Sequence, residues 1–369
     1  MKRRKRKIAT VELTNVNSQL LKVEMTYNVL NFKNFSAKGK VGFFLPPERM
    51  KPWERADIAK IEHSLLRGFR DYMYEAGFIE VQVPHITKAT GACENIATMF
   101  SLDYFGRQAY LTQTAQLQLE VLSQELGRVF TLIRSFRAEP EVDDRHLTEF
   151  SLFEFEHVSN GDLNELLRHI EATIWSGVRR VADEREEELE RLGVSKQELD
   201  IFRPPYERME YEEAIGFLQG CDVRIEYGDD LKSEHEKLIA SEVGPVFITH
   251  WPKHLKFFNM RESEIDESIV LSADLELPGV GESVGGAERE IRYERLKERL
   301  LESTMFKMLV ERGGNLSDFD WYLDFWRTVE NPKPHAGCGI GVARVMQSIL
   351  QAPSIKDVVV YPMDRLTLY

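Results

Sequence analysis

The sequence has few cysteines and no long apolar run, and each shortage excludes a class of protein. Its three cysteines, Cys93, Cys221 and Cys338, lie far apart without a CxxC pair, which suits a reducing compartment and provides no zinc framework. No apolar run approaches the ~20 residues that a membrane helix needs. The basic start MKRRKRK has no apolar segment after it and so differs from a secretory signal. These absences predict a cytoplasmic protein without a membrane anchor.

Basic residues are also outnumbered, since the net charge is −13. This balance argues against a general nucleic-acid coat and leaves room only for a local basic groove. The sequence contains neither GxGxxG nor GK[ST], so the dinucleotide and P-loop fingerprints do not apply. With 43% hydrophobic and 30% charged residues, the composition is that of an ordinary globular protein.

The pattern of predicted elements indicates an α+β fold with a mainly antiparallel sheet. Helices are predicted over residues 52–74, 115–126, 162–200 and 288–313, and the segment from about 180 to 200 is a charged, solvent-facing helix. Strands are predicted at FIEVQVP, VFITHW, SADLELPGVGE, AGCGIG and DVVVYP. Hairpins and separate helices favour α+β over alternating βαβ units. We expect residues 1–45 to form an extension and residues 46–369 the main domain.

A charged bend connects two predicted strands in FRAEPEVDDRHLTEF. Most charged turns are simply solvated. Here, however, Arg137 directly follows a strand, and a guanidinium is the preferred grip on phosphate oxygens. Glu139 can accept a hydrogen bond from an exocyclic amine, Phe150 can stack on a purine and His146 can reach terminal phosphates. The bend is therefore a candidate nucleotide site.

Glycines alternate in AGCGIGVARV, where Gly337, Gly339 and Gly341 leave one face of a strand bare. A flat ring can lie directly on such a backbone, and Arg344 begins the following helix. Tight strand packing with a surface arginine explains this pattern equally well.

Two carboxylates flank a Pro-Gly bend in DLELPGVGESVGGAER. Asp274 and Glu282 provide the one or two carboxylates that Mg²⁺ prefers besides phosphates and water. Two glycines and Arg289 follow. The sequence therefore predicts a Mg²⁺ site at Asp274 and Glu282.

Together these stretches resemble the catalytic core of class II aminoacyl-tRNA synthetases, in the subgroup for aspartate, asparagine and lysine. FIEVQVP resembles motif 1, FRAEPEVDDRHLTEF motif 2 and GCGIGVARV motif 3. The resemblance implies a homodimer formed through motif 1, and ATP and Mg²⁺ as cofactors. It implies catalytic roles for Arg137 and Arg344. It also implies an ATP site formed by Arg137, Glu139, Arg145, His146, Leu147, Phe150, Glu282, Gly341 and Arg344.

Within the subgroup, ACENIATMF, LTQTAQLQLE and KPHAGCGIG are most similar to asparaginyl-tRNA synthetase. Aspartate enzymes have a lysine where this chain has Leu119. The implied amino-acid site consists of Glu94, Gln113, Gln116, Leu119, Glu154 and Arg289. Asparagine can place its amide oxygen on Arg289 and its NH₂ on Glu154. Aspartate satisfies the same pair if it enters reversed, so both substrates stay open.

The acceptor is a separate question. About 45 residues precede the core, whereas a five-stranded anticodon-binding barrel needs roughly a hundred. We therefore expect no such barrel, and the chain resembles the truncated archaeal asparagine synthetase. This favours an amide ligase that transfers the activated acyl group to ammonia or a small amine. The alternatives are an asparaginyl-tRNA synthetase, with tRNA as partner, and a non-catalytic paralogue that binds amino acid or adenylate.

Overall fold

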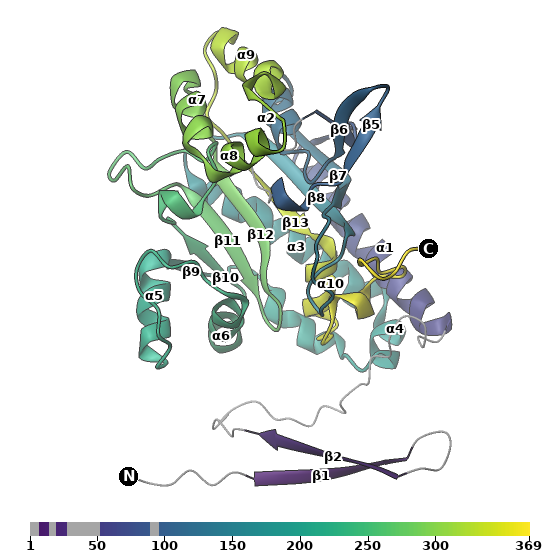
Figure 1. The fold of residues 1–369 in the computed structure, drawn as a ribbon. Helices are drawn as coiled ribbons and strands as arrows, with labels where there is room; N and C mark the ends of the chain where they lie inside the picture. Colours follow the sequence, from purple (N-terminus) through teal and green to yellow (C-terminus); the bar gives the residue numbers. More distant parts are fainter. Residues whose placement is uncertain (1–6, 15–19, 28–51, 89–95) are drawn as a thin grey trace. The chain divides into compact units, whose positions relative to one another are not determined.

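The computed structural model describes residues 7–14, 20–27, 52–88 and 96–369 (Figure 1). The chain divides into two compact units, Met1–Gly42 and Phe43–Tyr369. In the first unit, β1 (Lys7–Thr14) and β2 (Leu20–Tyr27) pair as an antiparallel hairpin. None of the described helices has the length and apolar character of a membrane span.

An eight-stranded sheet is the framework of the second unit. Its strands, in spatial order, are β3 (Ile79–Glu80), β7 (Arg128–Phe136), β8 (Glu149–Val158), β13 (His335–Gly341), β12 (Gly281–Glu288), β11 (Ser272–Leu277), β10 (Val246–Thr249) and β9 (Glu207–Glu210). Neighbours are antiparallel except for the pairs β3–β7 and β9–β10. A three-stranded sheet has the order β4 (Ile86–Thr87), β6 (Arg107–Leu111), β5 (Ser101–Tyr104). The predicted α+β class with a mainly antiparallel sheet is confirmed.

Three helices, α1 (Pro52–Glu75), α3 (Leu163–Glu184) and α10 (Val342–Ile349), pack their apolar residues against one face of the large sheet. Phe153 and Phe155 of β8 belong to this core, and the Phe153 ring meets Phe69 of α1 edge to face with centroids 5.2 Å apart. Because side chains alternate along a strand, Glu154 and Glu156 face the other side of the sheet. One strand thus contributes to the core and to a polar surface.

The remaining helices join this core or form smaller apolar clusters, two of which are large. They are α2 (Gln116–Leu126), α4 (Glu186–Arg191), α5 (Tyr211–Gly220), α6 (Ser233–Val243), α7 (Tyr293–Glu302), α8 (Thr304–Glu311) and α9 (Asp320–Thr328), with short 3₁₀ turns η1 (Ile96–Thr98), η2 (Lys196–Phe202), η3 (Lys253–Leu255), η4 (Leu316–Phe319) and η5 (Ile355–Val358). One cluster lies among α7, α8 and α9, and the other involves α5, α6 and β10.

Three predicted elements were wrong. The helix expected over 162–200 is broken into α3, α4 and η2, because α4 turns to pair with α1: Arg191 donates to Asp57 with Nε–Oδ2 and Nη2–Oδ1 distances of 2.8 and 2.9 Å. The helix expected over 288–313 begins only at Tyr293, since Glu288 still belongs to β12, and Ser303 caps a second helix. DVVVYP begins with the last two residues of η5 and forms no strand.

Helices α1 and α3 approach closely at a pair of glycines. A Cβ on Gly68 would lie 2.5 Å from Gly177 Cα and from Ser176 O. These are backbone atoms, which cannot rotate away. The two helices can therefore touch only because neither glycine has a side chain.

We expect Gly68→Ala to lower the free energy of unfolding by roughly 1–3 kcal/mol or more, because the methyl group forces the helices apart. Gly216→Ala in α5 is the matched control, since no atom lies within 4 Å of the added Cβ. That change should stabilise slightly through helix propensity. Urea unfolding of both variants provides the comparison, and equal midpoints would contradict the close approach.

Candidate active site

A cavity of about 390 Å³ opens on the face of the sheet opposite α1 and α3. It is bounded by β8, β11, β12 and β13 and by the connection between β7 and β8. Fourteen predicted site residues line it: Gln116, Leu119, Arg137, Glu139, Arg145, His146, Leu147, Phe150, Glu154, Asp274, Glu282, Arg289, Gly341 and Arg344. Segments far apart in the sequence therefore converge on one space.

Two predicted residues are not in this lining. Gln113 is fully buried, and its amide Nε2 donates to Thr98 Oγ1 at 3.1 Å. Glu94 lies outside the described residues.

The bend between β7 and β8 is ordered by Asp143. Its Oδ1 accepts hydrogen bonds from the backbone N of Arg145 and of His146, at 2.8 and 2.9 Å, and its carboxylate contacts the His146 ring. The Arg137 guanidinium lies 5.1 Å from the Phe150 ring centroid. Hydrogen bonds therefore order the bend, and its cationic and aromatic side chains face the cavity.

Arg344 joins this bend to β12. Its Nη1 donates to the backbone oxygen of Glu282 at 3.2 Å and its Nη2 to that of Arg145 at 3.4 Å. Burial and the neighbouring Arg145 lower the pKa of Arg344 from its usual value. Crowding of guanidinium groups is unfavourable without an anion, and a polyphosphate is the anion such a group would hold.

Acidic residues gather opposite the arginines. Asp274 Oδ1 and Glu282 Oε1 lie 3.7 and 3.4 Å from where a Cβ on Gly285 would be, so both carboxylates converge on the bare backbone there. Burial raises the pKa of Glu236 to about 7, reinforced by Glu282. Burial, partly offset by Lys256, raises the pKa of Asp274 to about 6.

Lys256 was not predicted but belongs to this acidic group. It forms an ion pair with Asp274 and its Nζ lies 3.8 Å from the Trp251 ring centroid. Glu276, fully buried, has a pKa raised well above its usual value by burial and by Glu236. Carboxylates whose pKa values are raised by one another suit a divalent cation, and Asp274 and Glu282 would hold it at the cavity wall.

At the other end, Arg289 and Glu154 are anchored separately. Arg289 donates from Nε and Nη2 to Glu156 Oε1 at 2.9 and 2.6 Å, and from Nη2 to Gly337 O at 2.9 Å. Glu154 Oε2 accepts from Thr114 Oγ1 and the backbone N of Ala115, at 2.9 and 2.8 Å.

A second buried glutamate supports this end. Glu120 Oε1 accepts from Gln116 Nε2 at 3.0 Å and from Asn259 Nδ2 at 2.6 Å. Burial would raise its pKa, but His335 and Arg289 keep it below the usual value. Burial, opposed by Arg289 and reinforced by Glu120, raises the pKa of Glu156.

The sequence prediction thus missed Glu120, Glu156, Glu236 and Lys256. The first two follow simple spacing: Glu120 lies one helical turn after Gln116, and Glu156 lies two residues after Glu154 on the same strand face. Glu236 and Lys256 come from segments with no local signal.

Comparison with known proteins identifies the family. The family described as tRNA synthetases class II (D, K and N) matches residues 50–365. The chain belongs to this family.

Its relatives include asparagine–tRNA ligases. That of Pyrococcus horikoshii is 36% identical over 314 residues, which cover 85% of this chain and 69% of the relative. That of Thermoplasma acidophilum is 34% identical over 311 residues, covering 84% and 69%.

Solved structures agree. Asparaginyl-tRNA synthetase from Pyrococcus horikoshii complexed with asparaginyl-adenylate matches with a TM-score of 0.79 at 30% identity, covering 98% of this chain and 83% of that one. The corresponding Entamoeba histolytica complex matches with a TM-score of 0.72 at 29% identity, covering 84% and 67%. This class II synthetase is accordingly an ATP-dependent, AMP-forming ligase.

The glycines of motif 3 differ in what they face. A Cβ on Gly337 would lie 2.2 Å from Glu156 Cδ, so Glu156 itself fills that space. A Cβ on Gly339 would lie 3.6 Å from Glu154 Cγ, an ordinary contact, within the cavity lining. Of these two positions, only Gly339 leaves backbone bare for a ligand in this synthetase.

We expect Gly339→Ala to leave the thermal midpoint unchanged while weakening amino-acid binding roughly tenfold or more, because the methyl group occupies cavity space beside Glu154. Gly337→Ala should instead lower the midpoint, since its Cβ collides with Glu156. Differential scanning fluorimetry and amino-acid titration separate the two effects. Equal loss of stability in both variants would contradict this distinction.

Divalent-cation binding should depend on pH. Protons compete with the cation for its predicted ligands Asp274 and Glu282, and the pKa of Asp274 is about 6. Affinity for Mn²⁺, used as a probe, should therefore be constant above pH 8 and fall as the pH drops below 7. A flat profile between pH 5 and 8 would show that these carboxylates do not bind the cation.

Proposed function

We propose that this synthetase activates asparagine with ATP to asparaginyl-adenylate and transfers the asparaginyl group to tRNA. One observation carries the proposal: the arginine and carboxylate groups at one end of the cavity and the Glu154–Arg289 group at the other line the same space. A nucleotide and a small amino acid can therefore meet there. The two solved relatives at 30% and 29% identity are described as complexes with asparaginyl-adenylate, which supports the same reaction.

Activation requires a carboxylate oxygen of the amino acid to attack the α-phosphorus of ATP. Pyrophosphate leaves with the bridging electron pair, and the carboxyl carbon becomes bonded to AMP through oxygen. Arg137 would stabilise charge on the α-phosphate, and Arg344 the outer phosphates. Mg²⁺, held by Asp274 and Glu282, would supply further neutralisation of phosphate charge. No side-chain nucleophile is needed, so positioning and electrostatics provide the rate.

Asparagine suits the amino-acid end better than aspartate. Glu120 and Glu156 both pair with Arg289, and the raised pKa of Glu156 indicates that a further negative charge would be unfavourable. The neutral amide of asparagine offers both a donor and an acceptor to such a group. Leu119, fully buried, supplies no second cation for an aspartate carboxylate.

The acceptor proposed here is tRNA, and this replaces the amide ligase favoured on sequence length. The matched relatives are asparagine–tRNA ligases, and ammonia as acceptor has no support among them. In the second step the terminal ribose hydroxyl of tRNA would attack the activated carbonyl, and AMP would leave.

A homodimer is proposed as well. Apolar side chains near the predicted motif 1 strand are exposed, with Tyr74 at 53%, Ile79 at 47% and Ile86 at 45%. Isologous association through this edge would cover them.

Substrate and acceptor can be tested in one series of assays. ATP–pyrophosphate exchange should be strong with asparagine and weak with aspartate. Transfer RNA plus asparagine should then yield a charged, alkali-labile product. Exchange with aspartate only, followed by asparagine release when ammonium is added, would overturn the proposal in favour of an amide ligase.

The phosphate site can be tested by Arg344→Ala. We expect exchange to fall roughly 10²–10³-fold, because a charged stabilising donor is lost. Arg327→Ala is the matched control, since that arginine is exposed on α9 and pairs with its helix neighbour Asp324 at 2.8 Å. Similar losses in both variants would indicate unfolding instead of a lost phosphate contact.

A further inference from the structure

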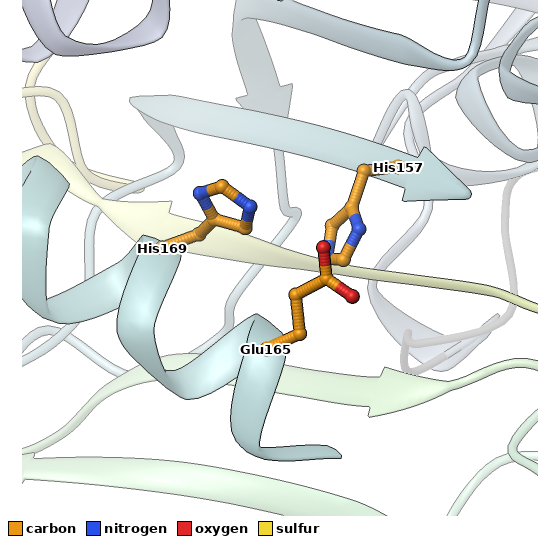
Figure 2. A group of neighbouring side chains, drawn as sticks. All are labelled: His157, Glu165 and His169. Atoms are coloured by element: carbon orange, nitrogen blue, oxygen red, sulfur yellow. The ribbon is translucent and has the colours of Figure 1, made fainter. Parts of the chain in front are cut away.

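A second group of ligand-type side chains lies on the opposite face of the sheet from the cavity. Donor atoms of His157, Glu165 and His169 all lie within 4.8 Å of one another. Figure 2 shows the three side chains converging from β8 and α3. None of the three lines the ATP cavity or has a role in the proposed reaction.

Regular elements build this group. His157 lies on β8 two residues after Phe155, so it faces α3 as Phe153 and Phe155 do. Glu165 and His169 are four residues apart on α3 and therefore share one face of that helix. The chain returns from β8 to α3 through a short connection, and the Asp162 side chain caps the helix by accepting from Asn164 N at 2.9 Å.

The ring of His157 is oriented for a ligand. Its Nδ1 lies 3.1 Å from Val158 O, and since a carbonyl can only accept, Nδ1 carries the proton. The remaining nitrogen, Nε2, then presents a lone pair. The side chain is fully buried, and Nε2 has no hydrogen-bond partner within the described part of the chain. An unpartnered buried acceptor is costly, so it indicates an interaction with something outside the protein.

His169 is arranged similarly. Its Nδ1 lies 2.7 Å from Tyr72 Oη of α1, which leaves Nε2 as its other donor atom. Burial lowers the pKa of His169 to about 3, and burial also lowers that of His157. Both imidazoles are therefore neutral at pH 7, the form that binds a metal ion.

We propose that His157, Glu165 and His169 form a Zn²⁺-binding site that joins β8 to α3. Two neutral imidazoles and one carboxylate are a ligand set typical of zinc, and the hydrogen bonds to Val158 and Tyr72 are the outer contacts that orient such ligands. Zinc bonds of about 2.0–2.1 Å place tetrahedral ligands ~3.4 Å apart, so the side chains must close by up to about 1.4 Å. Glu165, the half-buried member, has room to make this adjustment.

Neighbouring cations oppose the metal, since Arg128 and Arg168 both act electrostatically on His169. Arg128 Nη2 lies 3.6 Å from Glu165 Oε1, while its Nη1 donates to Ala76 O at 2.6 Å. The carboxylate has two oxygens and can face Arg128 with one and the metal with the other. The repulsion should nevertheless weaken binding, and removing the Arg128 charge should strengthen it.

The metal would stabilise the folded structure and would take no part in the reaction. Strand β8 carries Glu154 and Glu156 on its cavity face and His157 on its helix face. A metal that ties β8 to α3 would stabilise the strand on which the amino-acid pocket depends. This inference is independent of the proposed substrate and acceptor.

Titration of the full, EDTA-treated chain with Co²⁺ in saturating Mg²⁺ tests the site. The Asp274→Asn background removes a ligand of the predicted catalytic cation site. We expect a visible absorption band typical of tetrahedral nitrogen and oxygen ligation, and a higher thermal midpoint with Zn²⁺. Glu165→Gln should weaken binding about 10–100-fold, and Arg128→Gln should tighten it. Glu190→Gln, an exposed position on α4, is the matched control and should change nothing.

Two results would overturn the proposal. The first is an absence of both the absorption band and the thermal shift. The second is metal binding that stays unchanged in Glu165→Gln and in His169→Gln. Both variants keep a polar side chain of similar size, and circular dichroism establishes that they fold. Pyrophosphate exchange plays no part in the readout, so failure of the proposed function is separately recognisable.

Discussion

The pairing of Arg289 with Glu156 beneath the cavity is the interaction on which the amino-acid end of the site depends. A buried guanidinium requires a carboxylate partner, because an unpaired charge inside a protein is very costly. Glu156 meets this need at 2.6 Å, and its position over β13 leaves no room for a side chain at residue 337. Burial of the Arg289 charge thus explains two other residues: Glu156 neutralises it, and residue 337 is a glycine because Glu156 occupies the space beside it.

Strand β8 has different side chains on its two faces, and both faces fix its position in the sheet. Its even-numbered residues Glu154 and Glu156 belong to the cavity, whereas Phe153, Phe155 and His157 face α1 and α3. Moving the strand by one residue would exchange a hydrophobic face for a charged one. Its register is therefore strongly specified, and the same alternation brings His157 to α3 without any relation to catalysis.

The phosphate end follows a different rule. Arg137, Arg145 and Arg344 repel one another, and Asp274, Glu276 and Glu282 do so as well, so each group is unfavourable alone. Backbone carbonyls accept from Arg344, and Lys256 pairs with Asp274. Bound ligands would neutralise both groups: a polyanion would neutralise the arginines, and a cation would neutralise the carboxylates.

The sequence by itself predicted the fold class and fourteen of the residues that line the cavity. Alternation, helical spacing and the motifs at Arg137, Glu282 and Arg344 are patterns among neighbouring residues, and such patterns can be read from the sequence without a structure. It failed where partners come from distant segments: helix breaks set by Asp57 and Arg191, and Lys256 beside Asp274. Only the tertiary structure showed that Glu156 is the carboxylate that pairs with Arg289. Only the tertiary structure showed, too, that two histidines and a glutamate meet between β8 and α3. Charge pairing and ligand geometry depend on distance in space, which the order of residues along the chain does not state.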